Sequence, residues 1–422
     1  MKYLLLFILV IVFSISWLFA QQGGNLVIVG GALDSNNEAV YQTFIYLAGD
    51  NKDAIISIVP AASGSPSSSA ESFKNNLIHY GVHPENIYII PIAMFDCQST
   101  PDVDESLWKD GAENPDVAEI IEKSTGIWFT GGDQSRIVST LLREDGRQTP
   151  ALEALWQTFL NGAVIGGTSA GAAMMSPVMI TGGVSMAALK HGVSDKYIDM
   201  EQQDNGPLTL GHGLGFFKNG IIDQHFDKKN RLGRLIVAVY FNRNQFPLGF
   251  GIDENTALVY YSKTGLIEVV GEGGVTIVDG RNAQRIKKQR KTFIYLNFQI
   301  SYLEQGDAFN LSIDQYDINP EKKLTTGNEF YSISTEVQSG IFSSFSTTYK
   351  DLISYHLIDN KACKKVVTYC FDNSDTAFKV TFSKIPETEG YWTNNLKGRD
   401  SYSFIRVKVD VEPVRIILKG IK

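Results

Sequence analysis

Between Asn25 and about Val278, short apolar runs bounded by glycine or proline alternate with segments of helical character. This alternation is typical of βαβ units, in which helices connect parallel strands and cover the sheet. We therefore predict an α/β fold with a doubly wound, mostly parallel sheet, whose ligands bind at the carboxyl ends of the strands. The predicted strands are NLVIVGG, AIISIVPA, NIYIIPI, GIWFTGG and AVIGGTS, and the predicted helices are Ala70–His79, Ser135–Leu142 and Ala151–Leu160.

A basic, polar stretch at Arg281–Lys291 interrupts this alternation. Beyond it, aromatic and β-branched residues partly alternate with polar ones, which is typical of antiparallel strands. We therefore expect a signal peptide at 1–20, an α/β domain at 21–280 and a β-rich C-terminal module at 292–422. The predicted strands of the module are TFIYLNFQISYL, EFYSISTEV, KVVTYCF, AFKVTFSKI and YSFIRVKVDVEPVRIILKG.

The first residues, MKYLLLFILVIVFSISWLFAQQ, place Lys2 before an apolar stretch that ends at Ala20. This layout is typical of a secretory signal peptide, so we expect a mature chain that begins near Gln21 and is secreted or periplasmic, with no stable membrane insertion after cleavage. An uncleaved membrane anchor is the alternative, because Leu18 is not the small residue preferred two positions before the cleavage site.

Export bears on the three cysteines. Cys363 and Cys370 flank KKVVTY, which would allow a disulfide across a hairpin in an oxidising compartment and leave Cys97 unpaired. Three unlinked thiols are the alternative.

Composition excludes some partners. The formal net charge of −8 lacks the basic excess of a nucleic-acid-binding protein, so no nucleic acid is expected. His, Cys and Asp residues do not cluster with the spacing of metal ligands, so neither a metal nor an organic cofactor is expected.

The stretch AVIGGTSAGAAMM combines the parts of a nucleophile elbow. An apolar strand leads to a tight turn, Gly167 and Gly171 flank Ser169 in the pattern G-x-S-x-G, and a helix can start at Ala170. Because glycine and serine are common in ordinary turns, the pattern indicates a nucleophile only together with a base and an acid.

His225 is the candidate base, because it follows an apolar strand in GIIDQHF, where a doubly wound sheet places its active site. Asp253 and Glu254, in GIDENTA, are the candidate acids, since charged residues in an apolar setting are unfavourable unless they are used or paired. Neighbouring strand residues face opposite sides, so only one of the two can meet His225, and the pattern does not choose between them.

Two further sets of residues suit acyl transfer from an anionic substrate. Gly131 and Gly132, in WFTGGDQSR, lie between a strand and a helix and can, with the N–H of Ala170, donate to an oxyanion. Three cations that can bind a substrate carboxylate follow His225, namely Lys229, Arg231 and Arg234. The alternative interpretation is that they form a solvated basic face.

Four motifs, FTGGDQSR, GGTSAGA, IIDQHF…RLGRL and GIDENTA, occur in an order that closely resembles the cyanophycinase family of serine peptidases, relatives of the aspartyl dipeptidases. The resemblance covers roughly Asn25–Val278 and implies Ser169 as nucleophile, His225 as base and Glu254, rather than Asp253, as the orienting acid. It also implies substrate-binding roles for Gln134, Asp223, Gln224, Arg231, Arg234 and Asn255.

Three features depart from the family pattern, and one of them is Asp133, which stands where an asparagine is common. Lys229 stands where an arginine is expected, so the charge is kept but the planar fork that grips a carboxylate is lost. The stretch from Met186 to Leu210 is longer and more acidic than expected.

The resemblance implies hydrolysis of cyanophycin, a polyaspartate whose β-carboxyls each carry an arginine, with release of β-Asp-Arg dipeptides. Arg231 and Arg234 would bind the free carboxylates of such a unit, and Asp223 its guanidinium. We therefore predict a secreted serine exopeptidase that acts on cyanophycin, with a homodimer among the expected assemblies. The alternatives are a peptidase for short aspartyl or isoaspartyl peptides and a catalytically silent polymer-binding protein.

Overall fold

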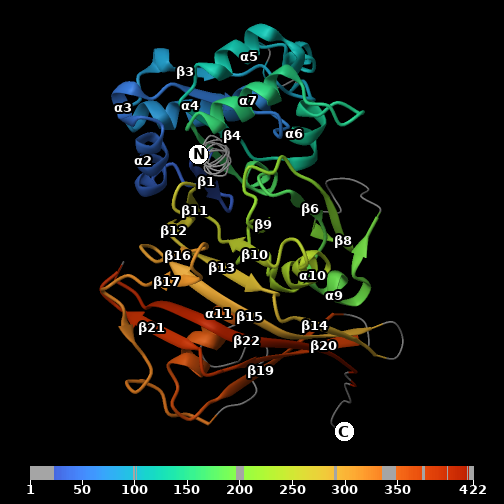
Figure 1. The fold of residues 1–422 in the computed structure, drawn as a ribbon, viewed down its shortest axis with the longest axis vertical. Helices are drawn as coiled ribbons and strands as arrows, with labels where there is room; N and C mark the ends of the chain where they lie inside the picture. The colour runs from blue at the N-terminus through green and yellow to red at the C-terminus, as the bar shows by residue number, and fades with distance from the viewer. Residues whose placement is uncertain are drawn as a thin grey trace, which may run out of the picture.

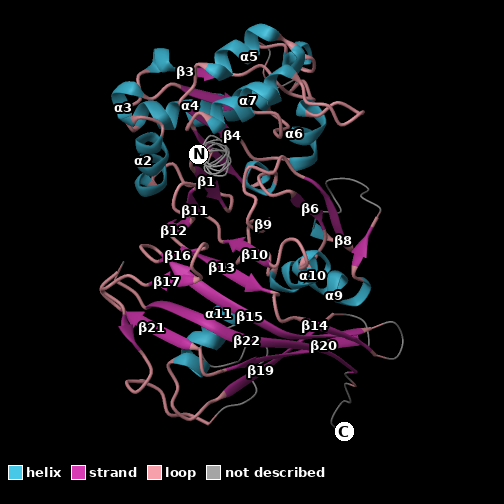
Figure 2. Ribbon diagram, in the orientation of Figure 1, coloured by secondary structure: helices cyan, strands magenta, loops and turns pink. Residues whose placement is uncertain are grey.

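The computed structural model describes residues 23–97, 100, 102–195, 204–288, 292–334, 348–372, 376–396, 398–415 and 417. Two large sheets and a small one organise these residues, and most helices gather around the sheet formed by the N-terminal strands (Figure 1, Figure 2). The predicted signal peptide at 1–20 lies outside the described residues. None of the helices that the structure describes is long and apolar enough to cross a bilayer.

Five parallel strands form one half of the nine-stranded sheet, as predicted. In spatial order they are β1 (Leu26–Val29), β5 (Val164–Thr168), β4 (Gly126–Phe129), β2 (Ile56–Val59) and β3 (Ile87–Ile89). Successive side chains of β1 enter different cores, because Leu26 and Ile28 join one buried cluster and Val27 and Val29 join another. Two buried faces explain why these runs are continuously apolar, and they confirm the doubly wound arrangement.

Helices cover both faces of this sheet. On the side of Val27 lie α2 (Glu38–Leu47), the short α3 (Asp50–Asp53) that follows it, and α4 (Pro66–His79); on the other side lie α5 (Pro115–Glu122), α6 (Gln134–Leu141), α7 (Pro150–Leu160) and α8 (Ala170–Ala173). The three predicted helices correspond to α4, α6 and α7. α4 begins earlier than predicted, because Pro66 occupies its first turn, where a missing N–H costs nothing.

Antiparallel strands extend the nine-stranded sheet beyond β1. In order these are β11 (Thr256–Tyr261), β12 (Leu266–Gly271), β16 (Ala308–Asn310) and β17 (Gln315–Asp317). A small sheet lies nearby and contains β6 (Val178–Gly182), β8 (Leu208–His212) and β7 (Val193–Ser194), with α9 (Ser185–His191) between β6 and β7.

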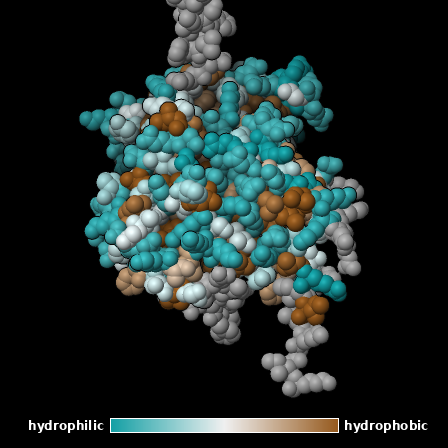
Figure 3. Space-filling model, turned by 60° about the horizontal axis from the view of Figure 1, so that its bottom comes forward, coloured by the Kyte–Doolittle hydropathy of each residue, from teal (hydrophilic) through white to brown (hydrophobic). Residues whose placement is uncertain are grey.

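The ten-stranded sheet contains strands from both predicted parts of the chain. Its main path runs through β9 (Ile221–Asp223), β10 (Leu248–Ile252), β13 (Gly274–Asp279), β15 (Phe293–Glu304), β22 (Ser401–Arg415), β21 (Glu389–Thr393) and β18 (Lys323–Leu324). Three more strands branch from this path: β14 (Gln284–Lys287), β20 (Thr376–Ser383) and β19 (Lys365–Phe371). α10 (Leu232–Asn242) and α11 (Tyr349–Ile353) pack into its core. Figure 3 shows the end of the molecule formed by the C-terminal strands as largely hydrophilic, with apolar side chains in separate small groups.

The predicted boundary at Arg281–Lys291 does not separate two sheets. β13, before it, pairs with β15, after it, from Gly274 opposite Glu304 to Asp279 opposite Gln299. β16 likewise pairs with β12. Residues 292–415, which we call the C-terminal part, therefore complete both large sheets. The polar composition of the boundary marks an exposed turn region that includes β14, and it carries no information on which strands pair across it.

The predicted strands of the C-terminal part are present with one exception. The described residues of EFYSISTEV, 329–334, form no strand, and Tyr331 makes an isolated bridge to Asn360. The remaining four segments correspond to β15, β19, β20 and β22.

The proposed pairing of Cys363 with Cys370 is wrong. Cys370 lies in β19 opposite Phe378, and Cys363 precedes the same strand, so KKVVTY is not a hairpin. Since a strand rises about 3.3 Å per residue, the two Cα atoms are far beyond the roughly 7 Å that a disulfide allows. The alternative of unlinked thiols agrees with this geometry, and none of the three described cysteines is in a disulfide.

Candidate active site

Ser169 stands on a tight turn between β5 and α8. Its φ of 55° and ψ of −106° lie outside the regions that most residues adopt. Two glycines allow the turn: a Cβ on Gly167 would lie 2.7 Å from the oxygen of Gly171, and a Cβ on Gly171 would lie 2.5 Å from the oxygen of Phe129. The predicted strand, turn and helix are therefore present, with the serine at the carboxyl end of β5.

His225 and Glu254 form a hydrogen-bonded chain with Ser169. His225 Nε2 lies 2.9 Å from Ser169 Oγ, and its Nδ1 lies 2.6 Å from Glu254 Oε1. A carboxylate only accepts hydrogen bonds, so Nδ1 carries the proton and Nε2 accepts from the serine hydroxyl. This is the arrangement of a nucleophile, a base and an orienting acid.

The two large sheets meet at this chain of side chains. Ser169 ends β5 of the nine-stranded sheet, whereas His225 and Glu254 follow β9 and β10, which are parallel neighbours in the ten-stranded sheet. The site therefore depends on how the two sheets are held against each other.

The loop after β1 connects the turns that carry these residues. The N–H of Ser169 donates to the oxygen of Val29 over 3.0 Å, and the N–H of His225 donates to the oxygen of Gly30 over 2.6 Å. Gly31, with φ of 107°, lies directly against the His225 ring. This loop is not among the residues predicted from the sequence, although the glycine pair that ends the apolar run VIVGG is its signal.

Burial is the main cause of a lowered pKa at His225. The hydrogen bond and charge of Glu254 raise this pKa, and the cations of Arg231 and Lys229 lower it, with a net result below the ordinary value of 6.5. The imidazole is therefore neutral and able to take up a proton at neutral pH.

Asp253 points away from the imidazole. Its fully buried Oδ2 accepts hydrogen bonds from the N–H of Gly274 at 3.0 Å, the hydroxyl of Tyr302 at 3.0 Å and Lys350 Nζ at 2.8 Å. The two neighbouring acids thus face opposite ways. Glu254 meets the histidine, and Asp253 meets the C-terminal part.

Two backbone segments lie beside Ser169 as candidate oxyanion donors. A Cβ on Gly131 would be 3.5 Å from Ser169 Cβ, so this glycine closely approaches the nucleophile. Ala170 is the first residue of α8, where an N–H has no partner within the helix. Gly132, with φ of 142°, packs on the backbone of Ala62 and shapes the turn.

Asp223 and Arg234 bind each other in the structure. Arg234 Nε donates to Asp223 Oδ2 over 2.8 Å, Nη2 donates to Oδ1, and Nη1 donates to the oxygen of Gly183 over 2.7 Å. The side chain of Arg234 is 3% exposed and that of Asp223 is 1% exposed. The expectation that Arg234 binds a substrate carboxylate and Asp223 a guanidinium stays a prediction, and it requires a substrate to compete with this buried ion pair, which is costly to break.

Lys229 and Arg231 share the carboxylate of Asp204. Lys229 Nζ donates to it over 2.8 Å and Arg231 Nη2 over 3.2 Å, while Arg231 Nη1 donates to the backbone oxygen of Gln224 over 2.6 Å. Burial and the nearby charge of Arg234 lower the pKa of Arg231 to about 10. Asp204 is not among the predicted site residues, and the acidic stretch from Met186 to Leu210 was its signal.

The three predicted amide residues differ in their surroundings. Gln134 and Gln224 are buried, and the side-chain oxygen of each has no hydrogen-bond partner among the described residues. The side-chain oxygen of Asn255 instead accepts hydrogen bonds from the N–H of Asp34 over 2.9 Å and from the side-chain amide of Asn37 over 2.8 Å. The two glutamines retain acceptors for a ligand, whereas Asn255 holds the turn after the acid.

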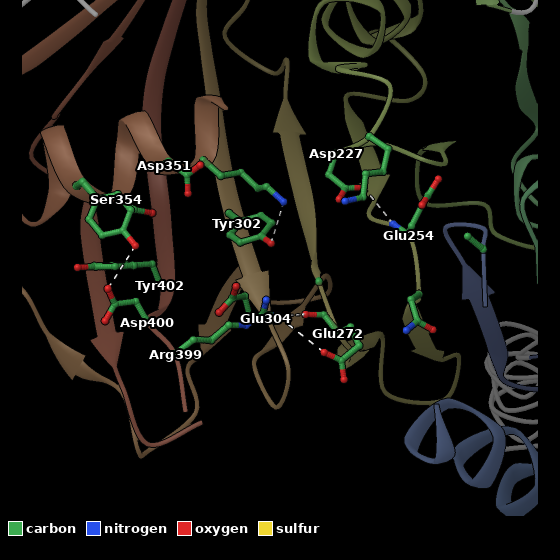
Figure 4. Close-up of a pocket in the computed structure, with 16 residues that line it drawn as sticks. Asp227, Glu254, Glu272, Tyr302, Glu304, Asp351, Ser354, Arg399, Asp400 and Tyr402 are labelled. Atoms are coloured by element: carbon green, nitrogen blue, oxygen red, sulfur yellow. Dashed lines mark hydrogen bonds and ion pairs between the residues drawn. The ribbon is translucent and has the colours of Figure 1, made fainter. Parts of the chain in front are cut away.

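Glu254 also lines a cavity of about 680 Å³ (Figure 4). It extends from Asp227 and Glu254, past Tyr302, to Asp400 and Tyr402 of the C-terminal part. The C-terminal part therefore lines the same cavity as the carboxylate that contacts the histidine. Although carboxylates are numerous here, no group of three metal-ligating side chains occurs in the described part of the chain.

Comparison with known proteins identifies similar chains. Residues 104–267 match the model of Peptidase family S51. The chain is 32% identical over 298 residues to a cyanophycinase from Geminocystis herdmanii, which covers 69% of this chain and 95% of the relative. It is 31% identical over 299 residues to a cyanophycinase from Synechococcus elongatus, which covers 69% and 80%. A solved peptidase from an acI-B1 actinobacterium is 20% identical, with a TM-score of 0.45 over 70% of this chain and 99% of that chain.

Proposed function

The chain belongs to the cyanophycinase family of serine peptidases, and from this membership we propose that it hydrolyses cyanophycin to β-Asp-Arg dipeptides with Ser169, His225 and Glu254. The observation that carries the proposal is the hydrogen-bonded chain from Ser169 through His225 to Glu254. It lies where a doubly wound sheet binds its ligands.

The proposed reaction begins with attack of Ser169 Oγ on an aspartyl carbonyl carbon, as its proton passes to His225 Nε2. The carbonyl oxygen becomes an oxyanion, for which the N–H groups of Gly131 and Ala170 are the proposed donors. His225 then gives its proton to the leaving nitrogen as the C–N bond breaks, which leaves an acyl group on Ser169. Water attacks this acyl carbon with His225 again as base, and the product leaves with a new carboxyl group as the proton returns to the serine oxygen.

The charged groups beside the site suit one unit of the polymer. A β-Asp-Arg unit carries carboxylates and a guanidinium. Lys229 and Arg231 are the proposed partners of a carboxylate, because both already hold that of Asp204, which the substrate would displace. The unpartnered oxygens of Gln134 and Gln224 are the proposed acceptors for N–H groups of the substrate.

One assay tests the proposal. The chain from Gln21 onward is incubated with cyanophycin, and released dipeptides are identified by mass spectrometry beside the Ser169→Ala variant. We expect β-Asp-Arg from the unchanged chain alone. Release by Ser169→Ala would contradict the mechanism. Turnover of short β-aspartyl or α-aspartyl peptides without turnover of the polymer would replace the proposed substrate by such peptides.

We further propose that the peptidase acts outside the cytoplasm, since residues 1–20 have the layout of a signal peptide. Detection of the chain in the exported rather than the cytoplasmic fraction tests this, and sequencing the N-terminus of the exported chain tests whether residues 1–20 are removed. A terminus near Gln21 supports cleavage, and an intact terminus on membrane-bound protein contradicts it.

A further inference from the structure

A short helix of the C-terminal part contacts the neighbours of both the proposed base and the proposed acid. α11 carries Tyr349 and Lys350 next to each other. The ring of Tyr349 lies edge-on at 6.4 Å from the ring of Phe226, the residue after the histidine. Lys350 Nζ lies 2.8 Å from Oδ2 of Asp253, the residue before the glutamate. Two consecutive residues thus touch both turns of the catalytic pair.

Lys350 is the counter-ion of a buried carboxylate. Asp253 is 0% exposed, and burying an ionised carboxylate without a partner is costly. Of the three donors to its Oδ2, Tyr302 and Gly274 are neutral and Lys350 is the cation. Figure 4 shows Tyr302 on the cavity wall between α11 and Glu254. Without Lys350, the buried carboxylate loses its only cationic partner among the described donors to Oδ2, and Glu254 is the next residue of the chain.

Tyr349 supports the other turn by packing. Its hydroxyl lies 2.5 Å from Thr276 Oγ1 of β13, which fixes the ring in place. Phe226 is fully buried, and its ring occupies the space that a side chain on Gly251 of β10 would need. Tyr349, Phe226 and β10 therefore form a packed stack that holds the backbone next to the histidine.

We propose that Tyr349 and Lys350 are positioning residues that hold the turns of His225 and Glu254 at the separation the triad requires. The inference rests on the proposed triad but not on the identity of the substrate. Through these two residues of α11, the C-terminal part supports the turns of the proposed catalytic pair and is not only a separate binding module.

Charge distinguishes this role from ordinary packing. The titratable groups around Asp253 are Lys350 on α11, Tyr302 on β15, Tyr349 and Asp227. Those around the histidine are Glu254, Arg231 and Lys229. A negative charge left alone at position 253 favours the protonated imidazole, and a positive charge left alone at position 350 disfavours it.

The test compares Lys350→Met, Asp253→Asn and the double variant by the pH profile of kcat/KM and the rate at which a serine-directed phosphonate labels Ser169. Lys350→Met is expected to lower kcat roughly 10- to 100-fold, because a misplacement of about 1 Å can cost on the order of 10²-fold. In the pH profile of kcat/KM, the acid limb of Lys350→Met is expected to move to higher pH, and the acid limb of Asp253→Asn is expected to move to lower pH. The double variant, which retains neither charge, returns the limb to its original pH and recovers part of kcat.

Conservative variants and a matched lysine complete the test. Lys350→Arg keeps the charge and is expected to keep most of kcat. Tyr349→Phe keeps the ring on Phe226 and is also expected to keep most of kcat, whereas Tyr349→Ala removes the ring and is expected to lower kcat. Lys379→Met breaks a partly exposed ion pair to Glu412 within the C-terminal part and is expected to leave both kcat and the acid limb unchanged.

Thermal unfolding of each variant identifies any loss of fold. Acid limbs that stay in place or move in the same direction in the two single variants overturn the inference, as does unchanged labelling of Lys350→Met. Failure of the unmodified chain to react with substrate and phosphonate would instead remove the proposed triad, and this inference with it.

Discussion

Gly31 lies against the imidazole of His225 so closely that any Cβ at position 31 would occupy the space of the ring. We expect Gly31→Ala to lower kcat/KM by more than about 10²-fold, because the ring must shift to make room. Gly162 is the matched control, since its φ of 108° nearly equals the 107° of Gly31 and nothing lies within 4 Å of a Cβ there.

Gly162→Ala therefore carries only the backbone strain of positive φ, about 1–2 kcal/mol. Steady-state kinetics and thermal unfolding of both variants separate the two effects. Equal activity in the two variants would show that the ring has room to move.

Glu254→Gln keeps the shape of the acid but removes its charge. An amide can donate as well as accept, so it no longer fixes the proton on His225 Nδ1, and kcat is expected to fall by about 10⁴-fold. Glu272→Gln is the control, because Glu272 lines the same cavity without reaching the histidine. Similar losses of kcat in both variants would assign the effect to the cavity rather than to the acid.

The acid limb of kcat/KM is expected below pH 6.5, because the pKa of His225 is lowered from that value. Burial and the cations disfavour the imidazolium, so removing the cation of Lys229 raises this pKa and moves the limb to higher pH. Measuring kcat/KM against pH for Lys229→Met checks the sign. Lys123→Met, in an exposed ion pair with Glu119, should leave the limb in place.

Asp204→Asn is expected to lower KM by roughly 3- to 10-fold, because an exposed ion pair is worth up to about 1 kcal/mol and the substrate carboxylate no longer competes with it. Asp314→Asn is the matched control and should leave KM unchanged, since Asp314 also bridges two cations, Arg281 and Arg406, at partial exposure. An increased KM in Asp204→Asn would mean that Asp204 helps to bind the substrate.

Asp223→Asn leaves the guanidinium of Arg234 buried beside a neutral amide. We expect a loss of about 3–5 kcal/mol in the free energy of unfolding, measured with urea. Asp145→Asn, in an exposed pair with Arg147, should change stability little. A stable Asp223→Asn variant with weakened substrate binding would support the prediction that Asp223 binds the ligand.

Local patterns account for what the sequence predicted well. The five parallel strands are continuous apolar runs, and the turn at Ser169 needs only nearby glycines, so both are visible within short windows. α2 was missed because VYQTFIYL is rich in aromatic and β-branched residues, which favour strands. Its burial against the sheet outweighs that preference.

Pairing between distant segments accounts for what the sequence did not show. An alternating pattern identifies β15 as a strand but not β13 as its partner, so the C-terminal residues looked like a separate module. Asp223 and Arg234 have the same sequence signature whether they face a ligand or each other. The residue pattern did not choose between Asp253 and Glu254, and only the family resemblance favoured Glu254, whose Oε1 lies 2.6 Å from His225 Nδ1 in the structure. That Asp253 instead binds Lys350, nearly a hundred residues further on, could not be predicted from local sequence.

The position of β13 has a consequence for biosynthesis. This strand pairs with β10, which leads to Glu254, on one side and with β15 of the C-terminal part on the other. Synthesis runs from the N-terminus, so Ser169, His225 and Glu254 all leave the ribosome before β13 and β15, and β13 remains an open edge until β15 emerges. A nascent chain thus holds every side chain of the proposed triad before it holds the sheet that supports them, and peptidase activity is expected to appear only after the C-terminal strands have joined.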